Sequence, residues 1–152
     1  MIKYIKRKDL EVEKYDACIE NSLQSRVYAF SWYLDIVAEN WDVLVLDDYK
    51  AVMPIPWKKK YFIKYVHPPL WLLELGVFSL DAKVNFQTFF KTLFRVFRFV
   101  ESRLNTDMKI DANSDFLESK EMQVASLEHG YDAVFNKYRK DRKKDLLKAN
   151  KL

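Results

Sequence analysis

The sequence predicts an α+β fold in which helices flank a central, mostly antiparallel sheet. Strand-like segments rich in β-branched and aromatic residues follow one another between Trp41 and Ser79. Short turns separate them, and connections this short join antiparallel neighbours. Segments with apolar residues at helical spacing precede and follow this region. A chain of 152 residues has the length of one domain, so we expect residues 1–152 to form a single domain.

The N-terminal third should hold one strand and two helices. Ile2–Ile5 is expected to form the strand, and Asp9 is a suitable N-cap for the first helix. Leu23–Ala29 should be a loop, and Ser31 is a suitable N-cap for the second helix. The apolar face of the first helix should comprise Val12, Tyr15, Cys18 and Ile19. That of the second should comprise Tyr33, Ile36 and Val37.

The central region should contain four strands. Val43–Leu46 is the first, and the Asp47-Asp48 pair predicts a turn into the second, Tyr49–Ile55. Pro54 and Pro56 should end that strand at an edge or a bulge, because proline cannot donate to the ladder. The remaining expected elements are a charged turn at Trp57–Lys60, a strand at Tyr61–His67 and a short extended piece at Trp71–Phe78 with a kink at Gly76.

The longest helix is expected after residue 80, with Asp81 or Asn85 as its N-cap. A helix this apolar is more than half buried or is covered by a partner. Phe94 and Phe99 lie outside its apolar stripe. The stripe comprises Phe86, Phe89, Phe90, Leu93, Val96, Phe97, Val100 and Leu104. The last expected elements are strands at Met108–Asp111 and Glu121–Leu127 and a basic helix at Tyr131–Leu152.

Composition argues against several classes of function. Gly76 and Gly130 are the only glycines, so there is no glycine-rich phosphate loop, and we expect this chain alone to bind no cofactor. Two histidines and one cysteine are too few for a convincing zinc site. We expect no signal peptide, because the N-terminal segment has basic residues but no apolar run, and no membrane span, because no window holds about 18 uninterrupted apolar residues. The single cysteine excludes an internal disulfide, and we expect a cytoplasmic protein.

Few side chains are candidates for chemistry. Cys18 with His67 or His129 could form a thiol–imidazole pair. Because Cys18 lies on the apolar face of its helix, a buried structural thiol is the simpler interpretation. His67 precedes Pro68-Pro69 at a strand end, a place where a ligand could meet the sheet. Other aromatic residues could line a groove or belong to the core: Trp57, Tyr61, Tyr65, Trp71 and Phe78.

The net charge of +4 is concentrated in the tail. Residues 137–152 contain eight Lys and Arg against two Asp, so residues 1–136 are net negative. A helix of this composition could bind phosphate groups, including those of nucleic acid, or could simply be a solvated terminal helix. Stacking on the bases of a single strand is unsupported, because no aromatic residue follows Tyr138.

Two segments of the chain resemble a known family. Residues 28–79 contain, in order, SWYLD at 31–35, a strand led by Trp41, MPIP at 53–56 followed by three lysines, Pro68-Pro69, and LGVFS at 75–79. Residues 131–151 contain a tyrosine followed by a basic helix. These segments are similar to the N-terminal part of FemAB-like proteins of the GNAT acyltransferase superfamily, of the Bacteroidetes type.

The resemblance implies a GNAT-like domain that is the N-terminal half of a two-half transferase. Such enzymes transfer an acyl or aminoacyl group to an amine-bearing acceptor, with acyl-CoA or aminoacyl-tRNA as possible donors. Their sites lie between the halves or in the second half. This chain alone is therefore expected to be inactive, to contribute to substrate binding, and to pair with a C-terminal GNAT-like half or with a second copy.

On this interpretation, an aromatic groove shapes one wall of a substrate site. Its residues would be Trp32, Tyr33, Tyr65, His67 and Trp71. Glu74 and the basic helix would hold a phosphate-bearing substrate through charge-assisted contacts. The basic residues concerned are Arg139, Arg142, Lys143 and Lys144. Relatives carry two glutamines where this chain has Leu73-Glu74, a departure that alters polar contacts there.

Two other functions stay open at this point. The first is a non-enzymatic interaction module that docks a partner through the Phe-rich helix. The second is nucleic-acid binding through the basic tail.

Overall fold

The computed structural model describes residues 1–104, 118, 121 and 128–149. Its internal contacts divide the chain into two units, Met1–Asp111 and Ala112–Leu152, and each is described by itself. The expectation of one domain over residues 1–152 stays a prediction. Apart from Glu121, the strands expected at Met108–Asp111 and Glu121–Leu127 lie outside the described residues.

An antiparallel sheet forms the centre of the first unit. Its described strands are β1 (Ile2–Lys6), β2 (Trp41–Leu46), β3 (Ala51–Lys60) and β4 (Ile63–Val66), paired in the order β1-β2-β3-β4. A fifth strand, β5 (Phe78–Ser79), pairs with the start of β3. All of these pairings are antiparallel.

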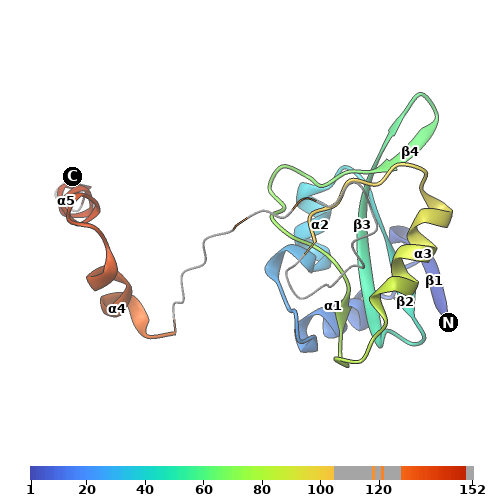
Figure 1. Cartoon of the computed structure of the whole chain (residues 1–152), viewed down its shortest axis with the longest axis horizontal. Coiled ribbons are helices and arrows are strands. Elements are labelled where there is room, and N and C mark those ends of the chain that lie inside the picture. The colour runs from blue at the N-terminus through green and yellow to red at the C-terminus, as the bar shows by residue number, and fades with distance from the viewer. Residues whose placement is uncertain (105–117, 119–120, 122–127, 150–152) are drawn as a thin grey trace. The chain divides into compact units, whose positions relative to one another are not determined.

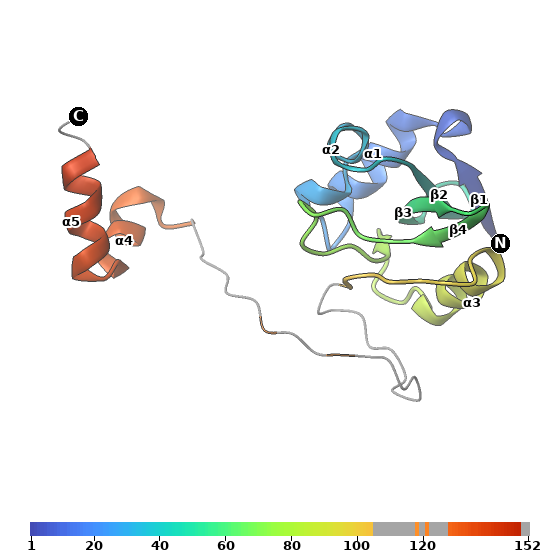
Figure 2. The ribbon, with the colours of Figure 1, turned by 90° about the horizontal axis from the view of Figure 1, so that it is seen from above.

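Helices cover both faces of this sheet, so the prediction of an α+β fold is confirmed. Helices α1 (Val12–Asn21) and α2 (Ser31–Val37) lie on one face, and α3 (Phe86–Val96) lies on the other (Figures 1 and 2). Each face has its own buried cluster. The cluster beneath α1 and α2 includes Tyr15, Ile19, Leu34, Val43, Val45 and Phe78. The cluster beneath α3 includes Leu44, Met53, Ile55, Phe89, Leu93 and Phe97.

Strand β2 shows why the central segment is continuously apolar. Successive side chains of a strand point to opposite faces. Val43 and Val45 accordingly pack on the α1 side, whereas Leu44 between them packs on the α3 side. Because both faces are covered there, positions 43–45 are all apolar, and the one buried polar residue of the strand, Asp42, is hydrogen-bonded within the fold.

The start of α1 differs from the prediction. Asp9 lies in a short 3-10 turn, η1 (Arg7–Asp9), and the helix begins two residues after Leu10. The backbone N–H of Glu11, just before the helix, donates to the Tyr49 hydroxyl at 3.0 Å. Asp9 is therefore not the N-cap, because the extra turn moves the helix start away from it.

The inner face of α2 also differs from the prediction. Ile36 is 77% exposed, and Leu34 is the fully buried residue instead. Ser31 is the first helical residue rather than the cap. Its N–H and hydroxyl donate to the two carboxylate oxygens of Asp16 in α1, at 2.8 and 2.6 Å. This anchor on α1 turns Leu34, and not Ile36, toward the sheet. Within the expected loop Leu23–Ala29, residues Val27–Ala29 form a second 3-10 turn, η2.

Strand β3 continues through its prolines. The prediction that it ends near Ile55 is wrong, and so is the prediction of a turn at Trp57–Lys60, which is strand. The Trp57 backbone N–H points to the β2 side and donates to the Asn40 carbonyl at 2.9 Å. The Pro56 carbonyl points to the opposite side and accepts from the His67 backbone N–H at 3.2 Å. Alternate residues present their backbone groups to the same side, so the nitrogens of Pro54 and Pro56 face away from β2. On the side away from β2, β5 pairs only with residues 51–52 of β3, and β4 pairs only with residues 57–60. Pro54 and Pro56 lie between these two pairings, so the ladder needs no N–H donor from either proline.

Strand β4 was predicted from 61 to 67 and is observed from 63 to 66. The segment that follows it is mostly irregular. The extended piece expected at Trp71–Phe78 is reduced to β5 and a single bridge between Leu75 and Leu104. Helix α3 begins after Asn85, whose side chain accepts from Gln87 N–H at 3.0 Å, which selects Asn85 over Asp81 as the cap. It ends at Val96 and not at Leu104, because the chain becomes extended and Val100 bridges to Val66 of β4.

The second unit contains two described helices, α4 (Gly130–Lys137) and α5 (Lys140–Ala149), in place of the single helix expected at Tyr131–Leu152. The break at Tyr138 leaves the last carbonyl groups of α4 without helical partners. Lys143 Nζ donates to one of them, the Asn136 carbonyl, at 3.0 Å. Among the described residues, no helix has the length and apolar character needed to cross a membrane.

Candidate functional site

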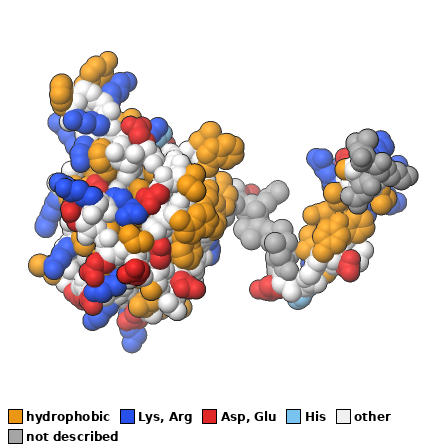
Figure 3. All heavy atoms as spheres, turned by 180° about the vertical axis from the view of Figure 1, so that it is seen from behind, with side chains coloured by type: hydrophobic (Ala, Val, Ile, Leu, Met, Phe, Trp, Pro, Cys, Tyr) orange, Lys and Arg blue, Asp and Glu red, His pale blue; other side chains and the backbone are white. Residues whose placement is uncertain are grey.

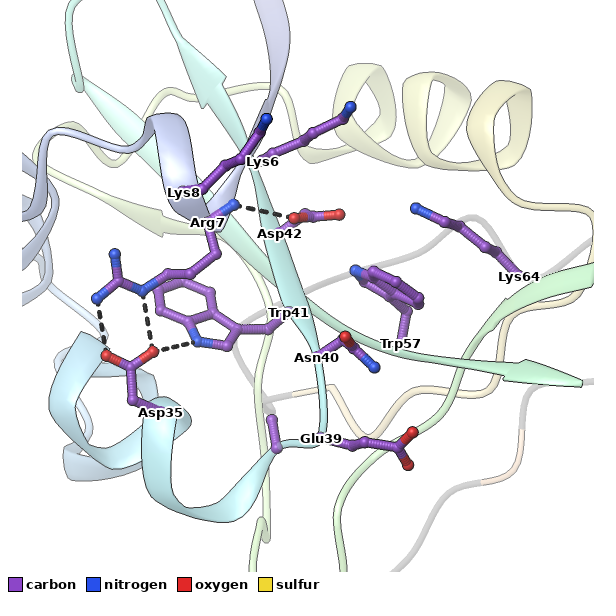
Figure 4. Close-up of a pocket in the computed structure, with 11 residues that line it drawn as sticks. Lys6, Arg7, Lys8, Asp35, Glu39, Asn40, Trp41, Asp42, Trp57 and Lys64 are labelled. Carbon is purple, nitrogen blue, oxygen red and sulfur yellow. Dashed lines mark hydrogen bonds and ion pairs between the residues drawn. The ribbon is translucent and has the colours of Figure 1, made fainter.

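A polar pocket of about 430 Å³ opens in the first unit where β1, α2, β2 and the β3–β4 hairpin meet (Figure 4). The chain supplies its walls from sequence-distant segments because β1 and β3 flank β2 on either side. Cationic and anionic side chains share the lining with two tryptophans. The lining residues are Lys6, Arg7, Lys8, Asp35, Ala38, Glu39, Asn40, Trp41, Asp42, Trp57 and Lys64.

One wall of the pocket is a fixed hydrogen-bonded group. The Arg7 guanidinium donates to both carboxylate oxygens of Asp35, at 2.9 and 2.7 Å, and lies over the Trp41 ring. The Trp41 indole N–H donates to the same carboxylate at 2.8 Å (Figure 4). These bonds, chiefly those from Arg7, lower the pKa of Asp35, and the pKa of Arg7 is raised by the same pair. Asp35 is therefore an anion that holds the wall in place.

A second carboxylate, Asp42, lies on β2 and is 4% exposed. It accepts from the Tyr4 hydroxyl and from Arg7 N–H, the latter at 2.9 Å. Burial, followed by the bond to Asp42, raises the pKa of Tyr4, so the phenol stays a neutral donor. Asp42 thus has two donors within the fold, and neither carboxylate of this wall is left free to act as a general base.

Other residues that line the pocket are donors unpaired in the described part of the chain, with Lys6 and Lys8 beside Arg7 and with Lys64 and Trp57 across from them (Figure 4). Within the described residues, the ammonium groups of Lys6, Lys8 and Lys64 form no hydrogen bond or ion pair. The Lys64 ammonium lies over the Trp57 ring, 3.9 Å from its centroid (Figure 4). Trp57 Nε1 is buried and has no acceptor among the described residues. This arrangement of donors can bind an anion, and phosphate oxygens would be suitable acceptors.

Three of the residues predicted for the aromatic groove lie together on the surface. The Tyr33 hydroxyl donates to the Trp71 carbonyl at 2.6 Å, and the rings of Trp32 and Tyr33 are 5.7 Å apart. With their neighbours they form a surface that we call the α2–loop patch, visible as hydrophobic side chains on one side of this unit (Figure 3). Its exposed members are Trp32, Ile36, Leu70, Trp71 and Leu73.

Tyr65 and His67 are not joined to this patch by any ring contact or hydrogen bond between described residues. Their rings lie 6.2 Å from each other, and His67 Nδ1 is 3.1 Å from a carboxylate oxygen of Glu101. The predicted five-residue groove is thus two separate groups, because β4 and the loop after it carry their aromatic residues to different places.

Glu74 is buried and forms an ion pair with Arg26. A substrate cation that contacted Glu74 would have to compete with this guanidinium. Glu74 therefore has a partner within the fold, since its carboxylate balances the charge of Arg26.

The basic residues predicted to hold phosphate lie in the second unit, in α5 or just before it. Arg139 and Arg142 are exposed and lie near Asp141 and Asp145, at 3.4 and 3.9 Å. Lys143 lies over the Phe135 ring in addition to its bond to α4, and Lys144 is exposed. Salt bridges this exposed contribute little, so these cations stay accessible to solvent and to a ligand.

Cys18 is buried, with its thiol 4.0 Å from the Phe78 carbonyl. Burial raises the pKa of this thiol to about 11, which disfavours the thiolate that nucleophilic catalysis requires. No described hydrogen bond joins it to His67, whose partner is Glu101. In the described part of the chain, no three His, Cys, Asp or Glu residues are arranged to hold a metal ion.

The sequence did not predict this pocket, because Trp57 was expected in a turn and the segments that carry Lys6 and Lys8 are distant from it in the chain. One signal was present. Within SWYLD, Ser31 binds Asp16, Leu34 is buried and Asp35 binds Arg7 and Trp41, so the motif connects α2 to the first strand pair.

No family model, no curated protein and no solved structure matches this chain. The fold therefore defines an α+β protein with a charged polar pocket, and the FemAB-like interpretation remains a proposal.

Proposed function

We propose that this chain is the substrate-binding, non-catalytic half of an acyl- or aminoacyl-transferase similar to FemAB proteins, and that the polar pocket holds a phosphate group of the donor. Acyl-CoA and aminoacyl-tRNA both carry phosphate, so the same site chemistry serves either. A partner half would supply the catalytic groups and the amine-bearing acceptor site. A cytoplasmic location, where both donors are made, belongs to this proposal.

The observation that carries the proposal is that the lining of one pocket includes three lysines with no hydrogen bond or ion pair among the described residues and an indole N–H with no acceptor there. A buried donor without an acceptor costs about 1–3 kcal/mol, and a phosphate oxygen at Trp57 Nε1 would remove that cost. The ammonium groups of Lys6, Lys8 and Lys64 would supply the charge-assisted contacts. Support for a non-catalytic role comes from Asp35 and Asp42, which are engaged in hydrogen bonds of the fold.

Removing pocket cations should weaken the binding of coenzyme A. The sequence has no glycine-rich loop and predicts that this chain alone binds no cofactor, but a pocket lined by side-chain cations can hold phosphate without such a loop. In place of that earlier expectation, we expect isothermal titration of the full chain with coenzyme A to show saturable binding that weakens with salt. Lys6→Gln with Lys8→Gln should weaken it about tenfold, because two charge-assisted contacts are lost. A matched control is Lys83→Gln with Lys91→Gln, which makes the same change in net charge at two exposed lysines outside the pocket.

Two outcomes would count against the proposal. If the pocket variant and the control bind coenzyme A equally well, phosphate is not held by this pocket. If the 152-residue chain alone transfers acyl groups to amines with robust turnover, it is not a non-catalytic half. A titration with aminoacyl-tRNA in place of coenzyme A identifies which donor class is preferred.

A second candidate function is protein interaction, favoured by the α2–loop patch. The Phe-rich helix expected to dock a partner already packs Phe89, Phe90 and Leu93 onto the sheet. In contrast, Trp71 is 71% and Ile36 77% exposed, and large exposed apolar side chains grouped on a surface mark contact sites. We propose that this patch, and not α3, contacts a second copy of the chain or a C-terminal half.

Sedimentation velocity at several concentrations tests this candidate. We expect wild-type chain to self-associate with rising concentration, and Ile36→Ser with Trp71→Ser to shift it to monomer. Phe94→Ser, an exposed apolar residue on α3 at the other face of the sheet, is the control and should leave association unchanged. A wild-type chain that is strictly monomeric at every concentration rules out self-association through the patch.

A further inference from the structure

The β3–β4 hairpin projects from the first unit and ends in apolar side chains (Figures 1 and 3). Tyr61 is 83%, Phe62 92% and Ile63 50% exposed. They form the two-residue turn and the first residue of β4, so no other part of the described hairpin lies beyond them. We call Tyr61, Phe62 and Ile63 the hairpin tip.

Lysines surround the tip, and acidic residues are absent from the whole hairpin sequence 57–67. Lys59 lies over the Phe62 ring and Lys60 over the Tyr61 ring, at 5.5 and 5.7 Å from the centroids. Lys58 precedes them on β3, and none of these three ammonium groups forms an ion pair within the described residues. The hairpin is therefore cationic along its length and apolar at its end.

The backbone of the tip indicates that its aromatic residues serve something other than stability. Tyr61 and Phe62 have φ angles of 46° and 69°, in the left-handed region that bulky residues rarely adopt. Two-residue hairpin turns with both φ angles positive strongly prefer Asn-Gly. The chain places two exposed aromatic residues in this turn, although Asn-Gly would adopt the same backbone with less strain and greater stability. Backbone strain of this kind is found mostly at functional positions.

We propose that the hairpin tip inserts into the surface of a membrane containing anionic lipids. Phe62 and Ile63 would enter the boundary between headgroups and acyl chains, and Tyr61 would lie at headgroup level, where tyrosine is enriched. Lys58, Lys59 and Lys60 would contact the lipid phosphates behind them. Each lysine near an anionic surface strengthens binding about fivefold.

The shape of the tip favours a lipid surface over single-stranded nucleic acid. Nucleic-acid sites of that kind place aromatic rings in a basic groove along which successive bases stack. Here the rings lie on a convex end, and the segment Lys58–Lys64 contains no Arg, Asn, Gln, Ser or Thr to hydrogen-bond a base edge. The cations of this segment are all lysines, and the tip carries the aliphatic residue Ile63 beside its aromatic rings. Lysines and apolar side chains in this order match a lipid surface, where phosphate groups lie over hydrocarbon.

Vesicle co-sedimentation of the full chain tests the proposal. Wild type should bind vesicles of phosphatidylcholine and phosphatidylglycerol in equal parts and should bind phosphatidylcholine alone much more weakly. Tyr61→Asn with Phe62→Gly should reduce binding to the mixed vesicles about tenfold or more, because the inserted rings are lost. The same variant should raise Tm by about 4 °C or more, since the turn strain is relieved. Reduced binding together with a higher Tm cannot result from misfolding.

Matched charge variants separate the hairpin from the tail. Lys58, Lys59 and Lys60 changed together to Gln should weaken vesicle binding far more than the same change at Lys140, Lys144 and Lys148 of α5. Insertion itself can be followed with Ile63→Cys labelled by an environment-sensitive fluorophore, whose emission should shift to the blue on mixed vesicles. Cys18 is buried and would stay unlabelled in the folded chain.

Three results would overturn the proposal. One is unchanged vesicle binding in the Tyr61→Asn, Phe62→Gly variant. Another is loss of binding in the α5 variant alone. The third is retention of a single-stranded RNA that depends on the tip while vesicles are not bound, which would assign the hairpin to nucleic acid instead.

Discussion

Phe89→Ala should lower the free energy of unfolding by about 3–5 kcal/mol. Phe89 is 0% exposed and lies in the middle of α3, in the cluster that this helix forms with the sheet. Truncation to alanine removes the buried ring and leaves a cavity between α3 and residues such as Leu44 and Met53. Neither the helix nor the sheet can close over that space, because their spacing is set by the neighbours Phe90, Leu93 and Phe97.

Urea unfolding measures this effect, and α3 offers a matched control. Phe94→Ala changes the same residue type in the same helix, but Phe94 is 61% exposed. The control should change the free energy of unfolding by no more than about 0.5 kcal/mol. Equal losses in the two variants would show that α3 does not pack on the sheet through the Phe89 face.

Asp35→Asn should lower the free energy of unfolding by about 2 kcal/mol at neutral pH. The substitution weakens a bidentate ion pair with Arg7 and the bond from Trp41, all charge-assisted. The expected loss of stability is no larger, because the Asp35 carboxylate is partly exposed and solvent screens its ion pair with Arg7. It should also loosen α2 from β2 and so disturb the pocket wall.

The same pair gives a pH dependence with a definite sign. The bonds from Arg7 lower the pKa of Asp35 in the folded chain below its unfolded value of about 3.9. The stabilisation is therefore complete above that unfolded value and is lost as pH falls through the folded pKa. The difference in stability between wild type and Asp35→Asn should shrink as pH is lowered from about 5 to about 2. A difference that stays constant over this range would mean that Asp35 titrates normally.

Much of the fold could be predicted from sequence because its signals are local. The alternation and β-branching of β2, the turn after it and the Asn85 cap each depend on a few neighbouring residues. The errors have a common origin in contacts between distant segments. Whether proline ends a strand depends on which edge is paired, and that is decided by β4 and β5. Whether Ile36 or Leu34 faces inward is decided by the anchor of Ser31 on α1.

The pocket could not be predicted for the same reason. Lys6 is far from Trp57 and Lys64 in sequence, and their approach follows from the pairing of β1, β2, β3 and β4. The aromatic surface was partly predictable: Trp32 and Tyr33 are neighbours on α2, whereas Tyr65 and Trp71 are separated by an irregular loop whose path is not encoded in a local pattern. The candidate residues Cys18 and His67 do not lead to the pocket, because Cys18 is buried and His67 pairs with Glu101.

The most direct test of the proposed function follows the indole N–H signals of the four tryptophans in an NMR titration of the full chain with coenzyme A. Trp57→Phe assigns the Trp57 signal. We expect that signal to move downfield as its N–H gains a phosphate acceptor, while the signals of the exposed Trp32 and Trp71 stay in place. Saturable binding that leaves the Trp57 signal unmoved, or no binding at all, would contradict a phosphate-binding role for the pocket.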